Sequence, residues 1–135
     1  MAVQLSVEVR NARLDAVETQ IGTAPVLKIW TGSPPATTAT ADSGTLLAQL
    51  TLPSNWMNAA SSGSKTLLGT WQDSSVNNTG TAGHFRLYDS GVTTCHIQGT
   101  VTATGDGGDM TVNSISFNSG ETFAITAFTL SEANS

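Results

Sequence analysis

Hydrophobic residues recur at a helical spacing only near the start of the 135-residue chain. Four of them fall on one face of a predicted helix, with Arg10 at its edge: Val7, Leu14, Val17 and Ile21. Ser6 is suited to the N-cap position, and Gly22 is suited to ending the helix. The pattern predicts one amphipathic α-helix over residues 6–21, within an N-terminal docking or oligomerisation region of residues 1–22.

After Gly22 the spacing of hydrophobic residues changes to the period of two that strands show. Seven segments carry this pattern: 26–31, 45–52, 65–73, 83–88, 93–104, 109–117 and 121–130. Turn residues separate them, for example Asp89, Ser90 and Gly91 between the fourth and the fifth. The regular spacing predicts a mainly β fold over residues 23–135, a β-sandwich or jelly-roll-like barrel of about seven strands.

The charged residues of the predicted helix form two like-charged pairs. Arg10 and Arg13 lie in its first half, and Asp15 and Glu18 lie in its second half. Each pair is spaced i,i+3, which places like charges side by side, and their order opposes the helix dipole. Two interpretations are open at this point. The charges are either solvated and unpaired, or they meet the opposite charges of an antiparallel neighbouring helix.

The second interpretation makes the helix an assembly surface, together with one tryptophan. Trp56 follows Pro53 in a predicted loop, where it is placed to contact another subunit. The candidate interface has these members: Arg10, Arg13, Leu14, Asp15, Val17, Glu18, Ile21 and Trp56. Trp30 and Trp71 lie in predicted strands, where each either packs in the core or an interface, or offers a platform on which a sugar stacks.

Composition narrows the class of function. Charged residues make up only 11% of the chain, so charge repulsion would do little to keep copies apart. The net charge of −5, with five basic residues in all, argues against a nucleic-acid partner. No apolar run reaches membrane-spanning length, and residues 1–5 lack the basic start of a secretion signal. We therefore expect a protein made in a cytoplasm, with neither a nucleic-acid nor a membrane partner.

Side chains that could carry chemistry are sparse. Cys95 and His96 are neighbours on a predicted strand, so they point to opposite faces, and Cys95 is expected in the core. His84 and His96 lack a third metal ligand at a recognisable spacing, and both are expected on the surface. Asp106 and Asp109 lack the spacing of a calcium loop. The sequence predicts no catalytic residue, no metal site and no cofactor, although an enzyme acting on cell-wall polysaccharide stays open if distant carboxylates converge.

Five stretches of the chain carry a resemblance to known proteins. They are NARLDAVETQIG (11–22), SGTLLA (43–48), LPSNWM (52–57), GTAGHFRLYD (80–89) and CHIQGTV (95–101). In these stretches the chain resembles a family of small proteins encoded by tailed bacteriophages and prophages, usually regarded as virion components. The resemblance implies a component of the virus particle, without distinguishing head, neck and tail, and it offers no catalytic residue for any position of this sequence.

Together these observations predict a non-enzymatic bacteriophage virion structural protein. It would be an accessory component on the particle exterior, as a head decoration, neck or tail protein, made in the host bacterial cytoplasm and located in the virion. Its expected partners are other virion proteins and further copies of itself in a homo-oligomer, with the N-terminal helix as the docking element. The alternative is a receptor- or glycan-binding β-sandwich module of the phage tail that recognises a host surface glycan.

Overall fold

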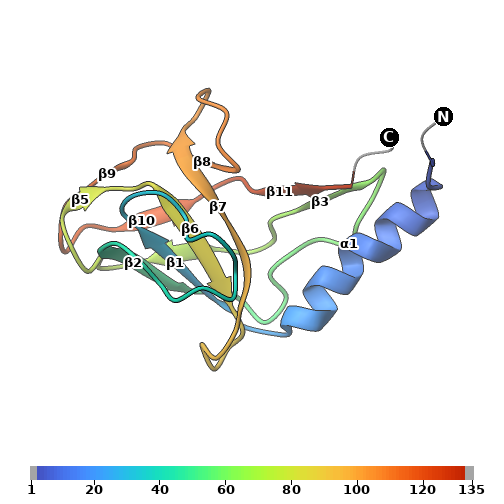
Figure 1. The fold of residues 1–135 in the computed structure, drawn as a ribbon, viewed down its shortest axis with the longest axis horizontal. Coiled ribbons are helices and arrows are strands. Elements are labelled where there is room, and N and C mark those ends of the chain that lie inside the picture. Colours follow the sequence, from blue (N-terminus) through green and yellow to red (C-terminus); the bar gives the residue numbers. More distant parts are fainter. Residues whose placement is uncertain (1–2, 133–135) are drawn as a thin grey trace.

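The computed structural model describes residues 3–132, which form a mainly β fold with one helix (Figure 1). The elements follow in this order: α1 (Val7–Ile21), β1 (Val26–Trp30), β2 (Leu46–Thr51), β3 (Ser64–Thr66), β4 (Trp71–Asp73), β5 (Gly80–Thr81), β6 (His84–Tyr88), β7 (Cys95–Ala103), β8 (Met110–Val112), β9 (Ser116–Phe117), β10 (Phe123–Ile125) and β11 (Thr129–Ser131). The outermost residues of the two predicted regions, 1–22 and 23–135, lie outside the described part of the chain.

The helix α1 begins and ends at its predicted capping residues. The Oγ of Ser6 accepts a hydrogen bond from the backbone N–H of Val9 at 3.2 Å. The N–H of Gly22 donates to the carbonyl of Glu18 at 2.9 Å. Gly22 has a φ of +91°, in the left-handed region that favours glycine. The predicted helix is therefore confirmed.

The largest sheet has five strands in the order β2-β1-β6-β7-β8, and it curls into a half-barrel (Figure 1). Neighbouring strands run antiparallel, except β7 and β8, which run parallel. The register places Ile29 of β1 opposite Phe85 of β6, and Lys28 opposite Arg86. The other strands of the described residues form three pairs, β10 with β4, β11 with β3, and β5 with β9.

The described residues hold eleven short strands, where about seven longer ones were predicted. The predicted strands 65–73, 109–117 and 121–130 each divide into two, and β5 forms where a loop was expected. Within the predicted strand 65–73, Gly69 has a φ of +79°, and the indole N–H of Trp71 donates to the carbonyl of Leu68 at 3.2 Å. The chain therefore turns between β3 and β4, which residue alternation alone does not reveal.

One hydrophobic core lies inside the curl of the sheet. On β6, Phe85 and Leu87 belong to this core, whereas the alternate residues of the strand face outward. The shorter strands and the segment before β3 close the core from the other side. They contribute Trp56 and Trp71, whose ring centres lie 6.1 Å apart.

The outer face of β6 is covered by residues 32–44, which we call the strap. Nη1 of Arg86 lies 2.6 Å from Oδ1 of Asp42, and Nη2 of Arg86 donates to the carbonyl of Thr38 at 2.8 Å. The amide of Gln98 on β7 donates to the carbonyl of Pro35 at 2.7 Å. The Ala- and Thr-rich segment within the strap is therefore fixed by polar side chains that reach it from the sheet.

Two predictions about chemistry-bearing residues are wrong. The strap explains the position of His84, and a register shift between β6 and β7 next to Cys95 breaks the alternation that placed Cys95 in the core. His84 is completely buried, not on the surface; its ring stacks with that of Trp30, and its Nδ1 lies 2.9 Å from the carbonyl oxygen of Gly32. Cys95 lies outside the core cluster, half-buried beside the guanidinium of Arg86. Sequence alternation treats the outer face of a sheet as solvated, whereas here the strap covers it.

Candidate functional site

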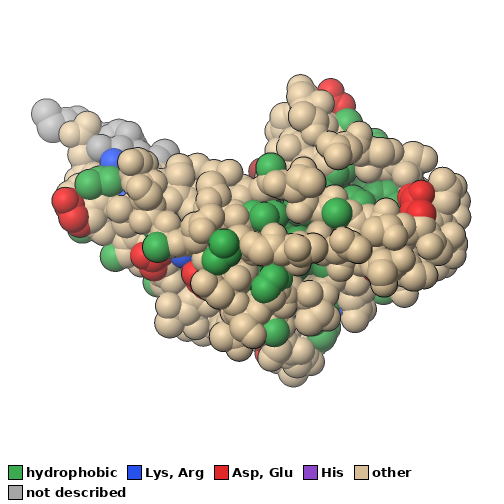
Figure 2. All heavy atoms as spheres, turned by 180° about the vertical axis from the view of Figure 1, so that it is seen from behind, with side chains coloured by type: hydrophobic (Ala, Val, Ile, Leu, Met, Phe, Trp, Pro, Cys, Tyr) green, Lys and Arg blue, Asp and Glu red, His purple; other side chains and the backbone are tan. Residues whose placement is uncertain are grey.

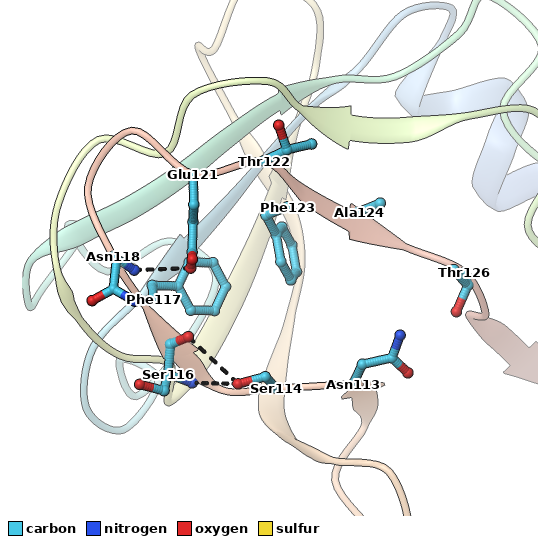
Figure 3. A pocket seen from close by; sticks show the side chains of 10 residues that line it. All are labelled: Asn113, Ser114, Ser116, Phe117, Asn118, Glu121, Thr122, Phe123, Ala124 and Thr126. Atoms are coloured by element: carbon cyan, nitrogen blue, oxygen red, sulfur yellow. Dashed lines mark hydrogen bonds between the residues drawn. The ribbon is translucent and has the colours of Figure 1, made fainter.

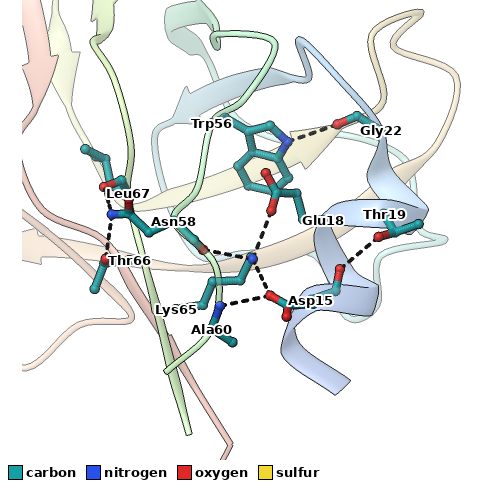
Figure 4. Close-up of polar contacts among 10 residues, drawn as sticks. All are labelled: Asp15, Glu18, Thr19, Gly22, Trp56, Asn58, Ala60, Lys65, Thr66 and Leu67. Atoms are coloured by element: carbon teal, nitrogen blue, oxygen red, sulfur yellow. Dashed lines mark hydrogen bonds and ion pairs between the residues drawn. The ribbon is translucent and has the colours of Figure 1, made fainter. Parts of the chain in front are cut away.

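One face of α1 is attached to the rest of the chain by polar contacts, shown in part in Figure 4. The side chain of Asn11 accepts a hydrogen bond from the N–H of Gly63 at 2.9 Å, and Oδ1 of Asp15 accepts one from the N–H of Ala60 at 2.9 Å. Asn11 and Asp15 are four residues apart, so they lie on the same face of the helix. The segment before β3 is thereby held against α1 through its own backbone.

Lys65 of β3 is the centre of this polar face. Its side chain is 1% exposed, and its Nζ lies 2.7 Å from Oδ1 of Asp15 and 2.9 Å from Oε1 of Glu18. The ammonium also donates to the carbonyl of Asn58 at 2.9 Å, so all three of its hydrogens have acceptors (Figure 4). The like-charged pair Asp15 and Glu18 is thus explained by one shared cation.

The pKa values of Asp15 and Lys65 are shifted in the directions that stabilise their charged forms. The hydrogen bond from Lys65, followed by that from the N–H of Ala60, lowers the pKa of Asp15 below its usual value. Burial alone would lower the pKa of Lys65. The hydrogen bonds to Asp15 and Glu18 and the attraction of their charges outweigh burial, so the pKa of Lys65 is raised. The cluster is therefore an ion triad that fixes α1 to β3.

The basic pair of the helix has a partner at the other end of the chain. Nη1 of Arg13 lies 3.0 Å from Oε1 of Glu132, and Nη1 of Arg10 donates to the carbonyl of Glu132 at 3.4 Å. Neither interpretation of the helix charges describes this arrangement. The acidic pair and the basic pair both have partners within the same chain, so the proposed antiparallel pairing of two helices is not needed to neutralise them.

Three of the eight predicted interface residues are buried inside the chain. Leu14 and Ile21 are 3% and 5% exposed, and Trp56 is fully buried, with its indole N–H donating to the carbonyl of Gly22 at 2.9 Å. The prediction that Trp56 contacts another subunit is therefore wrong for the folded chain. These three residues position α1 against the core, and of the apolar residues predicted for the interface only Val17 stays partly accessible.

On another face of α1 lies an apolar groove of about 540 Å³, between the helix and the strands β7 and β11. Partly exposed apolar side chains form its floor, namely Val17 of α1, Ile97 of β7 and Leu130 of β11. Polar side chains of Arg13 and His96 lie at its edges. Sequence reasoning found the helical contributor to this groove but not Ile97 and Leu130, because nothing local in the sequence places those strands beside α1.

The exposed large hydrophobic residues within 3–132 also gather at this end of the molecule. Val3, Val7 and Val9 are 80%, 36% and 45% exposed. Val3 precedes α1, and Val7 and Val9 lie in its first turn. Val7, which the sequence placed on the apolar face of the helix, therefore does not reach the core. The α1 end of the molecule therefore presents both an open apolar groove and exposed apolar side chains.

The few side chains that the sequence offered for reaction chemistry have the following surroundings. Burial raises the pKa of the Cys95 thiol despite the nearby guanidinium of Arg86, which disfavours the reactive thiolate. Oδ2 of Asp109 accepts hydrogen bonds from the backbone and hydroxyl of Thr100 at 2.9 and 3.1 Å. Among residues 3–132, no three His, Cys, Asp or Glu side chains gather as metal ligands would.

Within the same described range, no helix combines the length and hydropathy that crossing a bilayer requires. Comparisons of the chain with protein-family models, with curated proteins and with solved structures give no match. The geometry of the α1 end is therefore the main guide to function.

Proposed function

We propose that the chain is a non-enzymatic virion structural protein, an accessory component on the exterior of a bacteriophage particle that acts through protein–protein assembly. We also interpret the curled sheet, with the short strands that close its core, as a β-sandwich or jelly-roll-like barrel that carries α1 at one end. The observation on which the proposal rests is the apolar groove beside α1, together with the exposed valines at the start of the same helix.

Exposed apolar surface is the physical argument for assembly. A groove of this size with an apolar floor favours occupation by another apolar segment, because burial removes its floor from water. The chain has few charges to oppose such contact, and the face in Figure 2 shows how sparsely Lys, Arg, Asp and Glu are distributed. Both features suit a protein that works surrounded by other protein subunits, whether further copies of itself or other virion proteins.

A pair of matched helix variants tests this proposal. Ala16 is exposed at the groove, and Ala12 is exposed one turn earlier on α1, outside the groove. Arginine is a good helix former, so either substitution keeps the helix, but only Ala16→Arg places a bulky charge in the groove. We expect wild type and Ala12→Arg, but not Ala16→Arg, to be stoichiometric components of particles made by the phage or prophage that encodes the chain.

The measurement is mass spectrometry of purified particles, with light scattering of each isolated protein beside it. The proposal predicts an oligomer for wild type and Ala12→Arg, and a monomer for Ala16→Arg. Absence of the wild-type protein from purified particles would contradict the virion role. Equal incorporation of all three proteins would contradict the role of the groove.

The alternative is a glycan-binding tail module, for which the sequence suggested Trp30 or Trp71 as the stacking residue. Trp71 is 1% exposed, within the core. Trp30 is partly exposed, but its ring stacks on His84 and lies 5.9 Å from the Nζ of Lys28. Of the two tryptophans, only Trp30 therefore leaves part of its surface accessible to a sugar.

A further inference from the structure

A polar hollow of about 510 Å³ lies around the short strands β9 and β10 (Figure 3). In Figure 1 these strands and α1 lie at opposite ends of the molecule. Short hydroxyl and amide side chains surround the hollow, including Asn113, Ser114, Ser116 and Asn118, with Thr126 on the far side. The hollow is therefore separate from the assembly groove, and a ligand could occupy it whether or not the chain assembles through α1.

Two phenylalanine rings form the floor of the hollow. The ring centres of Phe117 and Phe123 lie 4.6 Å apart, and Figure 3 shows both rings between the polar side chains of the rim. Phe117 is 2% exposed and Phe123 is 9% exposed, so both rings are held by packing and only a small part of Phe123 is accessible. A rigid apolar floor beneath a polar rim suits a ligand with one apolar face and hydroxyl groups around its edge.

Some polar groups of the rim are already used to hold the loop in shape. Oε1 of Glu121 accepts a hydrogen bond from the N–H of Asn118 at 2.8 Å. The hydroxyl of Ser114 accepts one from the N–H of Ser116 at 3.2 Å and donates to the carbonyl of Ser116 at 3.4 Å. These contacts, drawn in Figure 3, fix the rim before any ligand arrives, which lowers the entropic cost of binding.

Other groups of the rim are free to bind a ligand. The side-chain amides of Asn113 and Asn118 and the hydroxyl of Thr126 make no hydrogen bond within residues 3–132, and all three residues are exposed. An amide offers two donors and an acceptor, and the second oxygen of Glu121 offers a further acceptor. Together they present donors and acceptors in the mixture that vicinal hydroxyl groups require.

The charge of the rim selects the class of ligand. No Lys or Arg lines the hollow, and its single charged residue is Glu121. A phosphate or carboxylate would therefore meet no cation there and would be repelled by that carboxylate. We propose that this hollow binds a neutral saccharide, with C–H groups of one sugar against the accessible part of Phe123 and its hydroxyl groups on the amides of Asn113 and Asn118 and the carboxylate of Glu121.

The test is an NMR titration of the full chain with three neutral oligosaccharides, cellotetraose, maltotetraose and tetra-N-acetylchitotetraose, and with tetragalacturonate as the anionic comparison. We expect at least one neutral probe to shift the side-chain amide signals of Asn113 and Asn118 saturably at millimolar concentration. Each of Asn113→Ala and Asn118→Ala should weaken that binding about fivefold, as the loss of one hydrogen bond does. Tetragalacturonate should bind more weakly than the neutral probe.

Two control variants make the result specific. Gln49→Ala removes an exposed amide from β2, away from the hollow, and should leave the affinity unchanged. Ala16→Arg should also bind the saccharide normally, because its substitution lies at the α1 end. The proposal is overturned if no neutral probe gives a saturable shift, if the double variant of Asn113 and Asn118 binds as wild type does, or if tetragalacturonate binds best.

Discussion

Lys65 shows how a single residue can define the position of a helix. Its ammonium is almost fully buried, yet three acceptors surround it, two of them carboxylates of α1. A buried charge is tolerated only when it is paired and hydrogen-bonded in this way. The like-charged spacing of Asp15 and Glu18, which is unfavourable in an isolated helix, becomes favourable once the cation of β3 lies between them.

We predict that Lys65→Met lowers the free energy of unfolding by about 2 kcal/mol at neutral pH. The variant keeps the apolar stem of the side chain, but it leaves two carboxylates and the carbonyl of Asn58 without their donor. Urea unfolding measures this change. The matched control is Arg13→Met, whose ion pair with Glu132 is exposed, so its loss should cost less than about 1 kcal/mol. Equal, small losses in both variants would contradict the central role of Lys65.

The pH dependence of the same variant follows from the directions of the pKa shifts. The pKa of Asp15 is lowered from 3.8, so its contribution to stability is present above that value and is lost as the pH falls. The pKa of Lys65 is raised from 10.5, so its contribution is present below that value and is lost as the pH rises. The difference between wild type and Lys65→Met should therefore be constant between these values and should narrow by about pH 3.

At the scale of elements, the strap is a segment whose conformation is fixed by side chains of the neighbouring sheet. Its residues are small and polar, and within it the hydroxyls of Thr37 and Thr40 pair at 3.0 Å. Its main attachments come from the sheet, where Arg86 and the hydroxyl of Tyr88 both bind the carboxylate of Asp42. Burial, and then the hydrogen bond to Asp42 and the charge of that carboxylate, raise the pKa of Tyr88 far above its usual value of 10.0.

The chain contains one tyrosine, so tyrosinate absorbance reports on Tyr88 alone. We predict that Tyr88 ionises well above its usual pKa in wild type, and that Asp42→Asn lowers this pKa because it removes the neighbouring negative charge. Because the folded-state pKa is raised, stability should fall as the pH rises above the usual value. Far-UV circular dichroism at each pH shows whether the chain is still folded.

The matched control for the titration is Asp106→Asn, in the exposed turn between β7 and β8, which should leave the pKa of Tyr88 unchanged. Ionisation of Tyr88 at its usual pKa in folded wild-type protein would contradict the buried contact with Asp42. An equal effect of both substitutions would show that net charge, and not the strap, determines the pKa.

An element could be predicted from the sequence where the residues that determine it lie close together in the chain. The bounds of α1 follow from Ser6 and Gly22, which act within one turn of the helix. The mainly β character of the remaining chain follows from residue alternation. Asp15, which binds Lys65, and Asp42, which binds Arg86, are 50 and 44 residues away from them, respectively, and no local pattern connects residues so distant in sequence. The ion triad, the strap contacts and both surface hollows therefore required the structure.

At the scale of the whole molecule, α1 lies at the opposite end from β9 and β10 (Figure 1). The apolar groove adjoins α1, and the polar hollow adjoins β9 and β10. A subunit held through its α1 end would leave the polar end accessible, so the assembly and saccharide proposals are geometrically compatible. The separation also means that variants of one surface serve as controls for the other.

Assembly has to be tested without removing α1, because this helix contributes to the core as well as to the groove. Removing residues 1–22 deletes the buried Leu14 and Ile21 and leaves Lys65 without its carboxylates. Losing two such apolar side chains costs about 5 kcal/mol or more, which is comparable with the whole stability of a small domain, about 5–15 kcal/mol.

We therefore predict that the chain without residues 1–22 fails to give a cooperative urea unfolding transition followed by tryptophan fluorescence, whereas Ala16→Arg keeps a midpoint close to that of wild type. A truncated chain with an unchanged midpoint would show that α1 is dispensable for folding, contrary to its buried contacts. If the truncated chain does unfold, its mass in solution carries no information about assembly. The comparison of Ala16→Arg with Ala12→Arg then separates loss of assembly from loss of fold, because both variants leave Leu14, Ile21 and the Lys65 ion triad in place.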